Sequence, residues 1–328
     1  MTQRIVFGSP LPGDPQGKLK GKFDLFVPKT TLTQEELESA SAGAHGLITL
    51  LSHRIDGGFL DRFPDIKIIS NYAVGYNNID VEEASKRGVL VTNTPDVLTE
   101  TTADLAWALM MSAARRIVEA DGFMRAGKFE GWTPWLFLGW DVWGKSLGIV
   151  GFGRIGQATA RRAQGFGMKV IYHDPSSEIE TLENGFSVKK VLLEDLLKQS
   201  DFVSIHCPLS EETTHLIGKR QLYLMKRSAI LVNTARGPVV DEVALVDALR
   251  NGVIAAAGLD VYENEPETTP GLLDLPQVVV APHIGSGTAE TREKMAHMAV
   301  DAVATFFAGV RPAHVVNPEV PAAPIFNR

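Results

Sequence analysis

Three polar residues follow a glycine-rich turn along this chain, and their side chains together suit one kind of chemistry. The turn spans residues 151–156 with the sequence GFGRIG, and Arg236, Glu265 and His283 come after it. An arginine can bind a carboxylate or polarise a carbonyl. A histidine can transfer a proton, and a nearby carboxylate raises its basicity and fixes its tautomer. The set predicts hydride transfer to a small 2-oxo acid.

The glycine-rich turn has the context that dinucleotide binding requires, because an apolar strand-like run precedes it and a helical pattern follows it. Gly151 permits the tight turn, Gly153 lets the backbone approach a pyrophosphate, and Gly156 lets helix and strand pack closely. We expect the phosphates at the helix N-terminus, around Arg154 and Ile155. The alternative is a purely structural glycine turn.

Asp174 stands where a ribose-binding acid belongs, at the end of the next strand-like run and 18 residues past Gly156. Its carboxylate can accept hydrogen bonds from both ribose hydroxyls of NAD, and it would repel the 2′-phosphate of NADP. The three residues that follow, 175–177, include no arginine or lysine. The sequence therefore predicts NAD as the cofactor.

Short apolar runs alternate with helical patterns in two series. The first series predicts strands at 4–7, 23–27, 46–51, 66–70 and 89–92, with helices at 33–41, 56–63 and 81–87. The second predicts strands at 146–150, 169–173, 202–206, 229–232, 255–259 and 278–281, with helices at 155–166, 192–199, 219–224 and 241–251. Such alternation is typical of α/β proteins with parallel sheets.

Two long helical stretches join the two series, at 99–125 and 288–308. The second has no strand left to pair with, so we expect it to cross back to the first unit. The predicted fold is α/β with two doubly wound parallel-sheet domains. A Rossmann NAD-binding domain (99–287) is inserted into a flavodoxin-like substrate domain (1–98 and 288–328).

Composition excludes several other classes of protein. The 328 residues are 45% hydrophobic and 22% charged, with a net charge of −7, which argues against nucleic-acid or anionic-membrane partners. No apolar run approaches the ~20 residues of a membrane span. One cysteine, Cys207, cannot form an internal disulfide, so we expect a cytoplasmic protein. No histidine or cysteine spacing indicates a metal site.

The chain resembles the D-isomer-specific 2-hydroxyacid dehydrogenases over essentially its full length. The glycine turn carries part of the resemblance, and six further motifs carry the rest: AVGYNNID (73–80), TNTP (92–95), HCPL (206–209), NTARG (233–237), GLDVYENEP (258–266) and PHIGS (282–286). Within the family, residues 71–98 and 137–158 look most like glyoxylate/hydroxypyruvate reductases. The resemblance supports the two-domain fold above.

The resemblance implies a role for each polar residue. Arg236 would bind the substrate carboxylate and carbonyl, and His283 would be the acid in reduction and the base in oxidation. Glu265 would pair with His283. The backbone amides of Val74 and Gly75 would hold the carboxylate from the other domain.

The resemblance also implies which residues line the cofactor site besides the glycine turn and Asp174: Cys207, Pro208, Thr234, Ala235, Asp260 and Gly285. In this family the position of Asp260 typically holds the nicotinamide amide. From the residues alone, Cys207 reads as a small buried residue at a strand end. Glu265 is also open to another reading, because Glu263, Glu265 and Glu267 alternate as they would in a solvated acidic loop.

Four tryptophans cluster before the glycine turn, at positions 132, 135, 140 and 143. Hydroxypyruvate reductases of the family carry a tryptophan near here that reaches a neighbouring subunit's pocket. In this chain Leu136 falls at that place and Trp135 lies one residue early. A pocket role for Trp135 and simple burial in a dimer interface both remain open, and we expect a homodimer.

Taken together, the sequence predicts an NAD-dependent enzyme that reduces a small 2-oxo acid, with glyoxylate or hydroxypyruvate favoured, to the D-hydroxy acid. One alternative is a phosphoglycerate or other D-2-hydroxyacid dehydrogenase. An alternative of a different class is an NAD-sensing binding protein similar to the transcriptional corepressors that share this fold and keep the same three polar residues.

Overall fold

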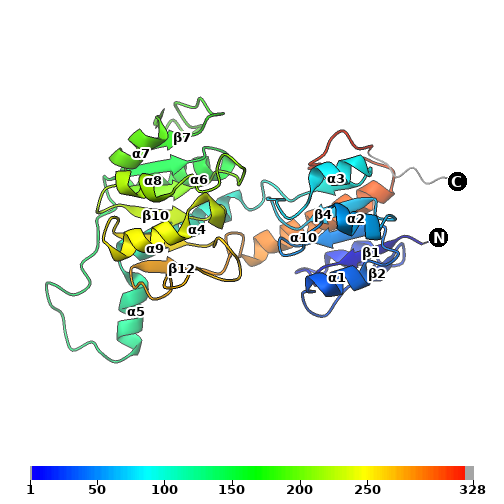
Figure 1. Cartoon of the computed structure of the whole chain (residues 1–328), viewed down its shortest axis with the longest axis horizontal. Helices are drawn as coiled ribbons and strands as arrows, with labels where there is room; N and C mark the ends of the chain where they lie inside the picture. Colours follow the sequence, from blue (N-terminus) through cyan, green and yellow to red (C-terminus); the bar gives the residue numbers. More distant parts are fainter. Residues whose placement is uncertain (1, 322–328) are drawn as a thin grey trace. The chain divides into compact units, whose positions relative to one another are not determined.

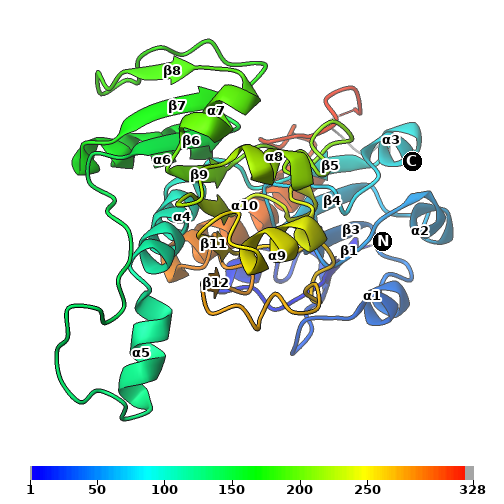
Figure 2. The same cartoon turned by 60° about the vertical axis from the view of Figure 1, so that its left-hand side comes forward.

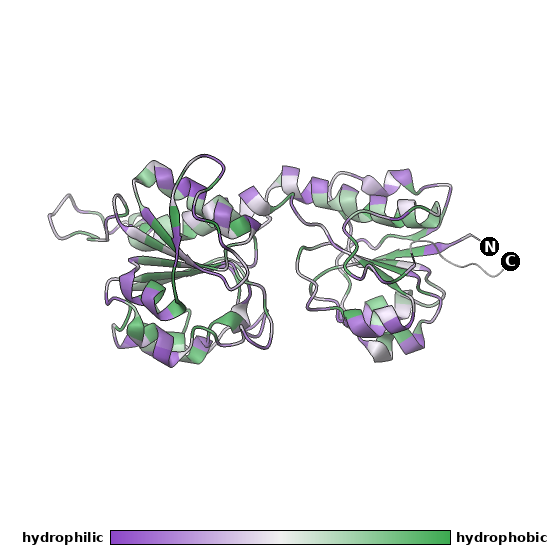
Figure 3. Ribbon diagram, turned by 90° about the horizontal axis from the view of Figure 1, so that it is seen from above, coloured by the Kyte–Doolittle hydropathy of each residue, from purple (hydrophilic) through white to green (hydrophobic). Residues whose placement is uncertain are grey.

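The chain divides into two compact units, as the computed structural model shows (Figure 1). Unit 1 comprises Met1–Leu98 with Gly287–Arg328, and unit 2 comprises Thr99–Ser286. The structure describes residues 2–321. Each unit is a parallel β-sheet with helices on both faces (Figure 3).

Unit 1 has five parallel strands in the order β2-β1-β3-β4-β5. The strands are β1 (Arg4–Phe7), β2 (Asp24–Phe26), β3 (Gly46–Thr49), β4 (Ile68–Asn71) and β5 (Leu90–Thr92). The helices are η1 (Pro15–Lys18), α1 (Gln34–Ala40), α2 (Gly57–Arg62), α3 (Val81–Lys86) and α10 (Ala289–Phe307). This strand order is that of flavodoxin-like folds, as predicted.

Apolar side chains of the unit 1 strands pack against helices α1, α2 and α3, and helix α10 packs on β3 and β4. After α10 the chain returns to β5. The Val316 N–H donates to Val91 O at 2.8 Å, and the Asn317 side chain accepts from Val91 N at 2.8 Å. These bonds join the end of the described chain to the same sheet as its beginning.

Unit 2 has seven parallel strands in the order β12-β11-β10-β9-β6-β7-β8. The strands are β6 (Ser146–Val150), β7 (Lys169–His173), β8 (Val188–Lys190), β9 (Phe202–Ile205), β10 (Ile230–Asn233), β11 (Ala256–Leu259) and β12 (Val278–Val280). The order is that of a Rossmann sheet with one added strand, and the direction of winding changes between β6 and β9. Ligands of such sheets bind at the carboxyl ends of the strands near this point.

Helices cover both faces of the unit 2 sheet, and the strands are apolar on both sides. The helices are α4 (Thr99–Ala114), α5 (Ile117–Arg125), α6 (Arg154–Ala163), α7 (Leu193–Gln199), α8 (Lys219–Leu224) and α9 (Glu242–Arg250), with short turns η2 (Gln164–Phe166) and η3 (Gly237–Val239). Ile149 packs with α4 and α6, whereas the next residue, Val150, packs with α7, α8 and α9. Each face therefore has its own core.

The single helix predicted over 99–125 is wrong, because two helices, α4 and α5, occupy that stretch. The chain breaks at Arg116, which has a left-handed backbone (φ 53°). Trp140 N donates to Ala114 O at 2.9 Å, so a distant residue satisfies a carbonyl at the end of α4. Arg116 also forms a paired hydrogen bond with Glu119 at 3.0 and 2.7 Å. The contact between Trp140 and Ala114 joins residues far apart in sequence, so periodicity could not predict it.

The edge strand β8 was absent from the prediction, because three residues at the edge of a sheet carry no apolar alternation. Helix α5 and the loop after it stand away from the rest of unit 2 (Figures 1 and 2). This segment exposes several apolar side chains, including Val118, Met124, Trp132 and Trp135. Among the described helices, none is long and apolar enough to cross a membrane.

Candidate active site

Two glycines of the 151–156 turn are required by close packing. Gly151 has a left-handed backbone (φ 90°), and a Cβ there would clash with the backbone of Cys207. A Cβ on Gly156 would clash with the carbonyl oxygen of Gly151. Strand β6, helix α6 and the end of β9 can therefore approach only because these positions lack side chains.

Gly153 differs from its two neighbours, because a Cβ there would meet nothing within 4 Å. Its φ of −72° is open to any residue, and it caps helix α6 without a side-chain hydrogen bond. Nothing acidic lies in the first turn of α6. The N-terminus of α6 therefore has open space beside Gly153, where a dinucleotide pyrophosphate would fit.

Asp174 follows strand β7 and is bonded directly to the glycine turn. Its Oδ2 accepts from Phe152 N at 2.7 Å, and its Oδ1 accepts from the backbone and hydroxyl of Ser176 at 2.8 and 2.7 Å. Burial acts to raise the pKa of Asp174, but these hydrogen bonds outweigh it and lower the pKa. The side chain is a fixed carboxylate beside the turn.

Two more strand ends contribute to the same edge of the sheet. Cys207 and Pro208 follow β9, and burial raises the pKa of the Cys207 thiol to about 11, so it remains an unreactive thiol. Thr234 and Ala235 follow β10. The Thr234 hydroxyl is buried, and no residue in the described range 2–321 bonds to its Oγ1. A buried polar atom without a partner is what a site for a polar ligand presents.

His283 and Glu265 are in contact. His283 Nδ1 lies 2.8 Å from Glu265 Oε2, and Glu265 Oε1 accepts from Tyr262 N at 3.0 Å. Burial acts to raise the pKa of Glu265, but the hydrogen bond and charge of His283, the Tyr262 amide and the charge of Arg236 together lower it. His283 also has a left-handed backbone (φ 53°), a strained conformation typical of functional sites.

Asp260 supports the turn that carries His283. Its two oxygens accept from Ile284 N and Gly285 N, both at 2.7 Å, and its carbonyl accepts from His283 N at 2.8 Å. Burial raises the pKa of Asp260, although the two amides and the charge of His283 oppose this. The resemblance implied a cofactor contact for Asp260, but the sequence did not predict its hydrogen bonds to the turn that carries His283.

Arg236 lies shortly after the end of β10, near Glu265 but without an ion pair among the described residues. Its Nη1 donates to Ala235 O at 2.6 Å, and no acidic side chain within residues 2–321 forms an ion pair with it. Burial lowers the pKa of Arg236 and the charge of Glu265 raises it, but a guanidinium stays protonated in proteins. The side chain is a part-buried cation available to an anionic ligand.

The segments that carry Arg236 and Glu265 touch at a glycine. A Cβ on Gly237 would overlap the backbone of Tyr262 and Glu263, so only glycine permits this approach. The Tyr262 hydroxyl donates to Ala281 O at 2.9 Å, which joins the same segment to the strand before His283. The structure thus brings Arg236, Glu265 and His283 together at neighbouring strand ends.

The three alternating glutamates have different surroundings. Glu265 contacts His283, whereas Glu263 lies 2.7 Å from His215 Nε2. Glu267 is exposed, and its side chain forms no ion pair with any residue of the described range 2–321. The geometry selects Glu265 as the partner of His283, which the residue pattern alone left open.

Val74 and Gly75 lie in unit 1, in the loop after β4. Asn93 Nδ2 donates to Val74 O at 2.7 Å, and Asn71 Nδ2 donates to Gly75 O at 2.8 Å. In the part of the chain that the structure describes, the amides of Val74 and Gly75 bond to no acceptor. Fixed carbonyls and open N–H groups suit an anion. Sequence reasoning missed Asn71 and Asn93, although polar residues at strand ends could have indicated them.

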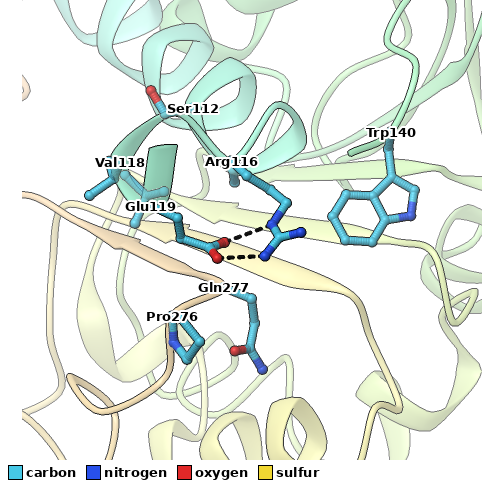
Figure 4. Close-up of a pocket in the computed structure, with 9 residues that line it drawn as sticks. Ser112, Arg116, Val118, Glu119, Trp140, Pro276 and Gln277 are labelled. Atoms are coloured by element: carbon cyan, nitrogen blue, oxygen red, sulfur yellow. Dashed lines mark hydrogen bonds and ion pairs between the residues drawn. The ribbon is translucent and has the colours of Figure 1, made fainter. Parts of the chain in front are cut away.

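A cavity of about 160 Å³ lies elsewhere in unit 2 (Figure 4). Arg116, Glu119, Trp140 and Gln277 are among the residues that line it. Gln277 precedes β12, so the cavity lies at the amino end of the sheet, whereas Arg236 and His283 follow carboxyl ends. The cavity is therefore separate from the candidate site.

Trp135, for which the sequence left a pocket role and interface burial open, is 80% exposed in the single chain.

Known proteins resemble both the sequence and the fold. The NAD-binding-domain model of the D-isomer specific 2-hydroxyacid dehydrogenases matches residues 107–285. A glyoxylate reductase of Korarchaeum cryptofilum is 49% identical over 324 residues, which cover 98% of this chain and 97% of that protein.

Solved structures agree with the sequence matches. The TT0316 protein of Thermus thermophilus has a TM-score of 0.90 at 43% identity, over 96% of this chain and all of that one. An NADPH-dependent glyoxylate/hydroxypyruvate reductase of Sinorhizobium meliloti has a TM-score of 0.85 at 33% identity, over 97% and 99% of the two chains. The chain belongs to the D-isomer-specific 2-hydroxyacid dehydrogenase family and is an NAD-binding oxidoreductase.

Proposed function

We propose that this protein reduces glyoxylate, or a similar small 2-oxo acid such as hydroxypyruvate, to the 2-hydroxy acid with NADH. The observation that carries the proposal is the Glu265–His283 pair at 2.8 Å, near the part-buried cation of Arg236. A relative that is 49% identical over nearly the whole chain is a glyoxylate reductase. This favours glyoxylate over the phosphoglycerate and corepressor alternatives.

In this proposal the polar residues divide the work between binding and proton transfer. Arg236 binds the substrate carboxylate and polarises its carbonyl. His283 Nδ1 is engaged by Glu265, which leaves Nε2 to deliver a proton to the carbonyl oxygen. The open amides of Val74 and Gly75 give the carboxylate further donors. A bound nicotinamide would supply the hydride.

The residues of unit 2 fit the cofactor that its family model implies. The Gly151–Gly156 cradle would hold the pyrophosphate, and Asp174 the adenine ribose. Cys207, Pro208, Thr234, Ala235, Asp260 and Gly285 would line the rest of the site. We therefore assign cofactor binding to 99–287, and substrate binding to 1–98 with 288–328.

We also propose a homodimer, and a cytoplasmic location that cell fractionation can test. The exposed apolar side chains of α5 and the following loop support the dimer, because patches of this kind mark interaction sites. The buried, unreactive thiol of Cys207 is compatible with a reducing compartment.

A panel of 2-oxo acids, measured as kcat/KM with NADH and NADPH, tests the proposed function. Glyoxylate or hydroxypyruvate should give the highest value. His283→Ala should lower kcat by about 10²–10⁴-fold, the loss expected for a general acid, while NADH binding changes little. His297→Ala is the matched control, since His297 also lies near a glutamate, Glu293, at 3.8 Å.

Near-normal turnover of His283→Ala would remove this residue from the mechanism. If the wild-type protein bound NADH but turned over no 2-oxo acid, the binding-protein alternative would be favoured instead.

The two classes of glycine in the turn should respond differently to substitution. Gly153→Ala should fold normally, because its Cβ meets open space, but should weaken NADH binding on the order of tenfold or more by occupying the cradle. Gly156→Ala should lower the free energy of unfolding by on the order of 1–3 kcal/mol, because its Cβ meets Gly151 O. The Tm should fall by several degrees as a result. Fluorescence titration with NADH and thermal melts measure the two effects, and a reversed pattern would contradict the assignment.

Cofactor preference should depend on the charge of Asp174. Wild-type kcat/KM should favour NADH over NADPH by at least about tenfold, because the carboxylate repels a 2′-phosphate. Asp174→Asn keeps the size and removes the charge, so it should narrow the NADH/NADPH ratio. The ratio is the relevant measure, since Asp174 also bonds to Phe152 in the turn. Wild-type preference for NADPH, the cofactor of the Sinorhizobium meliloti relative, would refute this reading.

Light scattering should give a mass of about twice the 35.6 kDa of one chain. Replacing both Trp132 and Trp135 with serine should shift the protein toward the single-chain mass, because these side chains are 82% and 80% exposed in one chain. The exposed Leu192→Ser, remote in sequence from this segment, serves as the control. A wild-type mass of one chain would exclude the dimer.

A further inference from the structure

We infer that Glu242 is a positioning residue, which holds Glu265 against His283 by fixing both ends of the turn that carries Glu265. The inference rests on the proposed function, because it concerns the partner of the proposed proton donor. Glu242 is the first residue of α9 and only 4% exposed. A glutamate is rarely so buried unless hydrogen bonds compensate it, so its partners indicate its role.

The Glu242 carboxylate spans the two ends of the turn. Its Oε2 accepts from Glu263 N at 3.0 Å, and its Oε1 accepts from Thr269 N at 3.3 Å. Glu265 lies between these two residues in the chain. Within the turn, Glu267 N donates to Asn264 O at 2.9 Å. One buried side chain therefore anchors the start and the end of the turn on helix α9.

A second link strengthens the start of the turn. Glu242 N donates to Glu263 Oε2 at 3.2 Å, so the two residues exchange hydrogen bonds. His215 Nε2 lies 2.7 Å from the other carboxylate oxygen of Glu263. Both carboxylates lie at the N-terminus of α9, where the helix dipole favours negative charge.

The turn then presents Glu265 to His283. Glu265 Oε1 is held by Tyr262 N at 3.0 Å, and Oε2 lies 2.8 Å from His283 Nδ1. A shift of the turn by less than 1 Å would lengthen the second contact beyond hydrogen-bond range. The other charged or titratable groups that act on this pair are Arg236, Asp260 and Tyr262. Glu242 acts on Tyr262 and contacts Glu263.

The test compares pH profiles of kcat/KM for glyoxylate reduction, from about pH 5 to about pH 9. Reduction takes a proton from His283, so kcat/KM for reduction should fall as pH rises. Glu265→Gln should move the falling limb to lower pH, because it removes the charge that lies 2.8 Å from the His283 ring. Glu242→Gln presents one backbone amide of the turn with a donor instead of an acceptor, and should move the limb the same way but by less than Glu265→Gln does.

The double variant separates a positioning role from a general structural one. If Glu242 acts through Glu265, then Glu242→Gln should add no further shift when Glu265 is already Gln. Glu267→Gln is the control, because it removes a negative charge from the same turn without touching Glu242. Glu242→Asp is the second variant, since it keeps the buried charge but is too short to span both amides. NMR titration of the His283 ring measures the same effect without turnover.

A shift for Glu265→Gln with unmoved profiles for both Glu242 variants would overturn the inference alone. A lowered Tm with an unmoved profile would do the same. If Glu265→Gln itself left the profile unmoved, the proposed role of Glu265 would fall, and this inference with it. Should Glu242→Gln fail to fold, the Glu242→Asp profile and ring titration decide.

Discussion

The hydrogen bond between Glu265 and His283 depends on two backbone segments being held at a fixed separation. His283 lies in a left-handed turn that Asp260 holds through the amides of Ile284 and Gly285. Glu265 lies in a turn anchored at Tyr262 and at the helix α9. Neither residue could make this contact reliably from a mobile loop, because hydrogen bonding weakens steeply with misalignment. The supporting residues are thus part of the site.

Parallel strands explain why the site forms where it does. The carboxyl ends of β6, β7, β9, β10, β11 and β12 lie along one edge of the unit 2 sheet, because every pairing among them is parallel. Residues that follow those ends are brought together although more than 100 positions separate Gly151 from His283. Glycine at 151, 156 and 237 then permits the close backbone contacts that this crowded edge requires.

Much of the fold could be predicted from the sequence, since buried parallel strands read as short apolar runs between helical patterns. Each unit has the doubly wound parallel sheet that was predicted. The two errors, the unbroken helix over 99–125 and the missing strand β8, share a cause. The break at Arg116 follows from the bond of Trp140 to Ala114 O, and β8 is too short and too close to the edge to carry a periodic signal. Both depend on contacts between residues distant in sequence.

The sequence by itself determined which residue types were available for the chemistry: a glycine turn, an arginine, a carboxylate and a histidine, each after a strand-like run. The alternation of Glu263, Glu265 and Glu267 could not distinguish these residues, and only the family resemblance pointed to Glu265. The tertiary structure shows the contacts themselves, since Glu263 lies against His215, Glu265 lies against His283, and Glu267 is exposed. It alone also disclosed Glu242, whose burial and two amide partners arise from folding and leave no pattern in the chain.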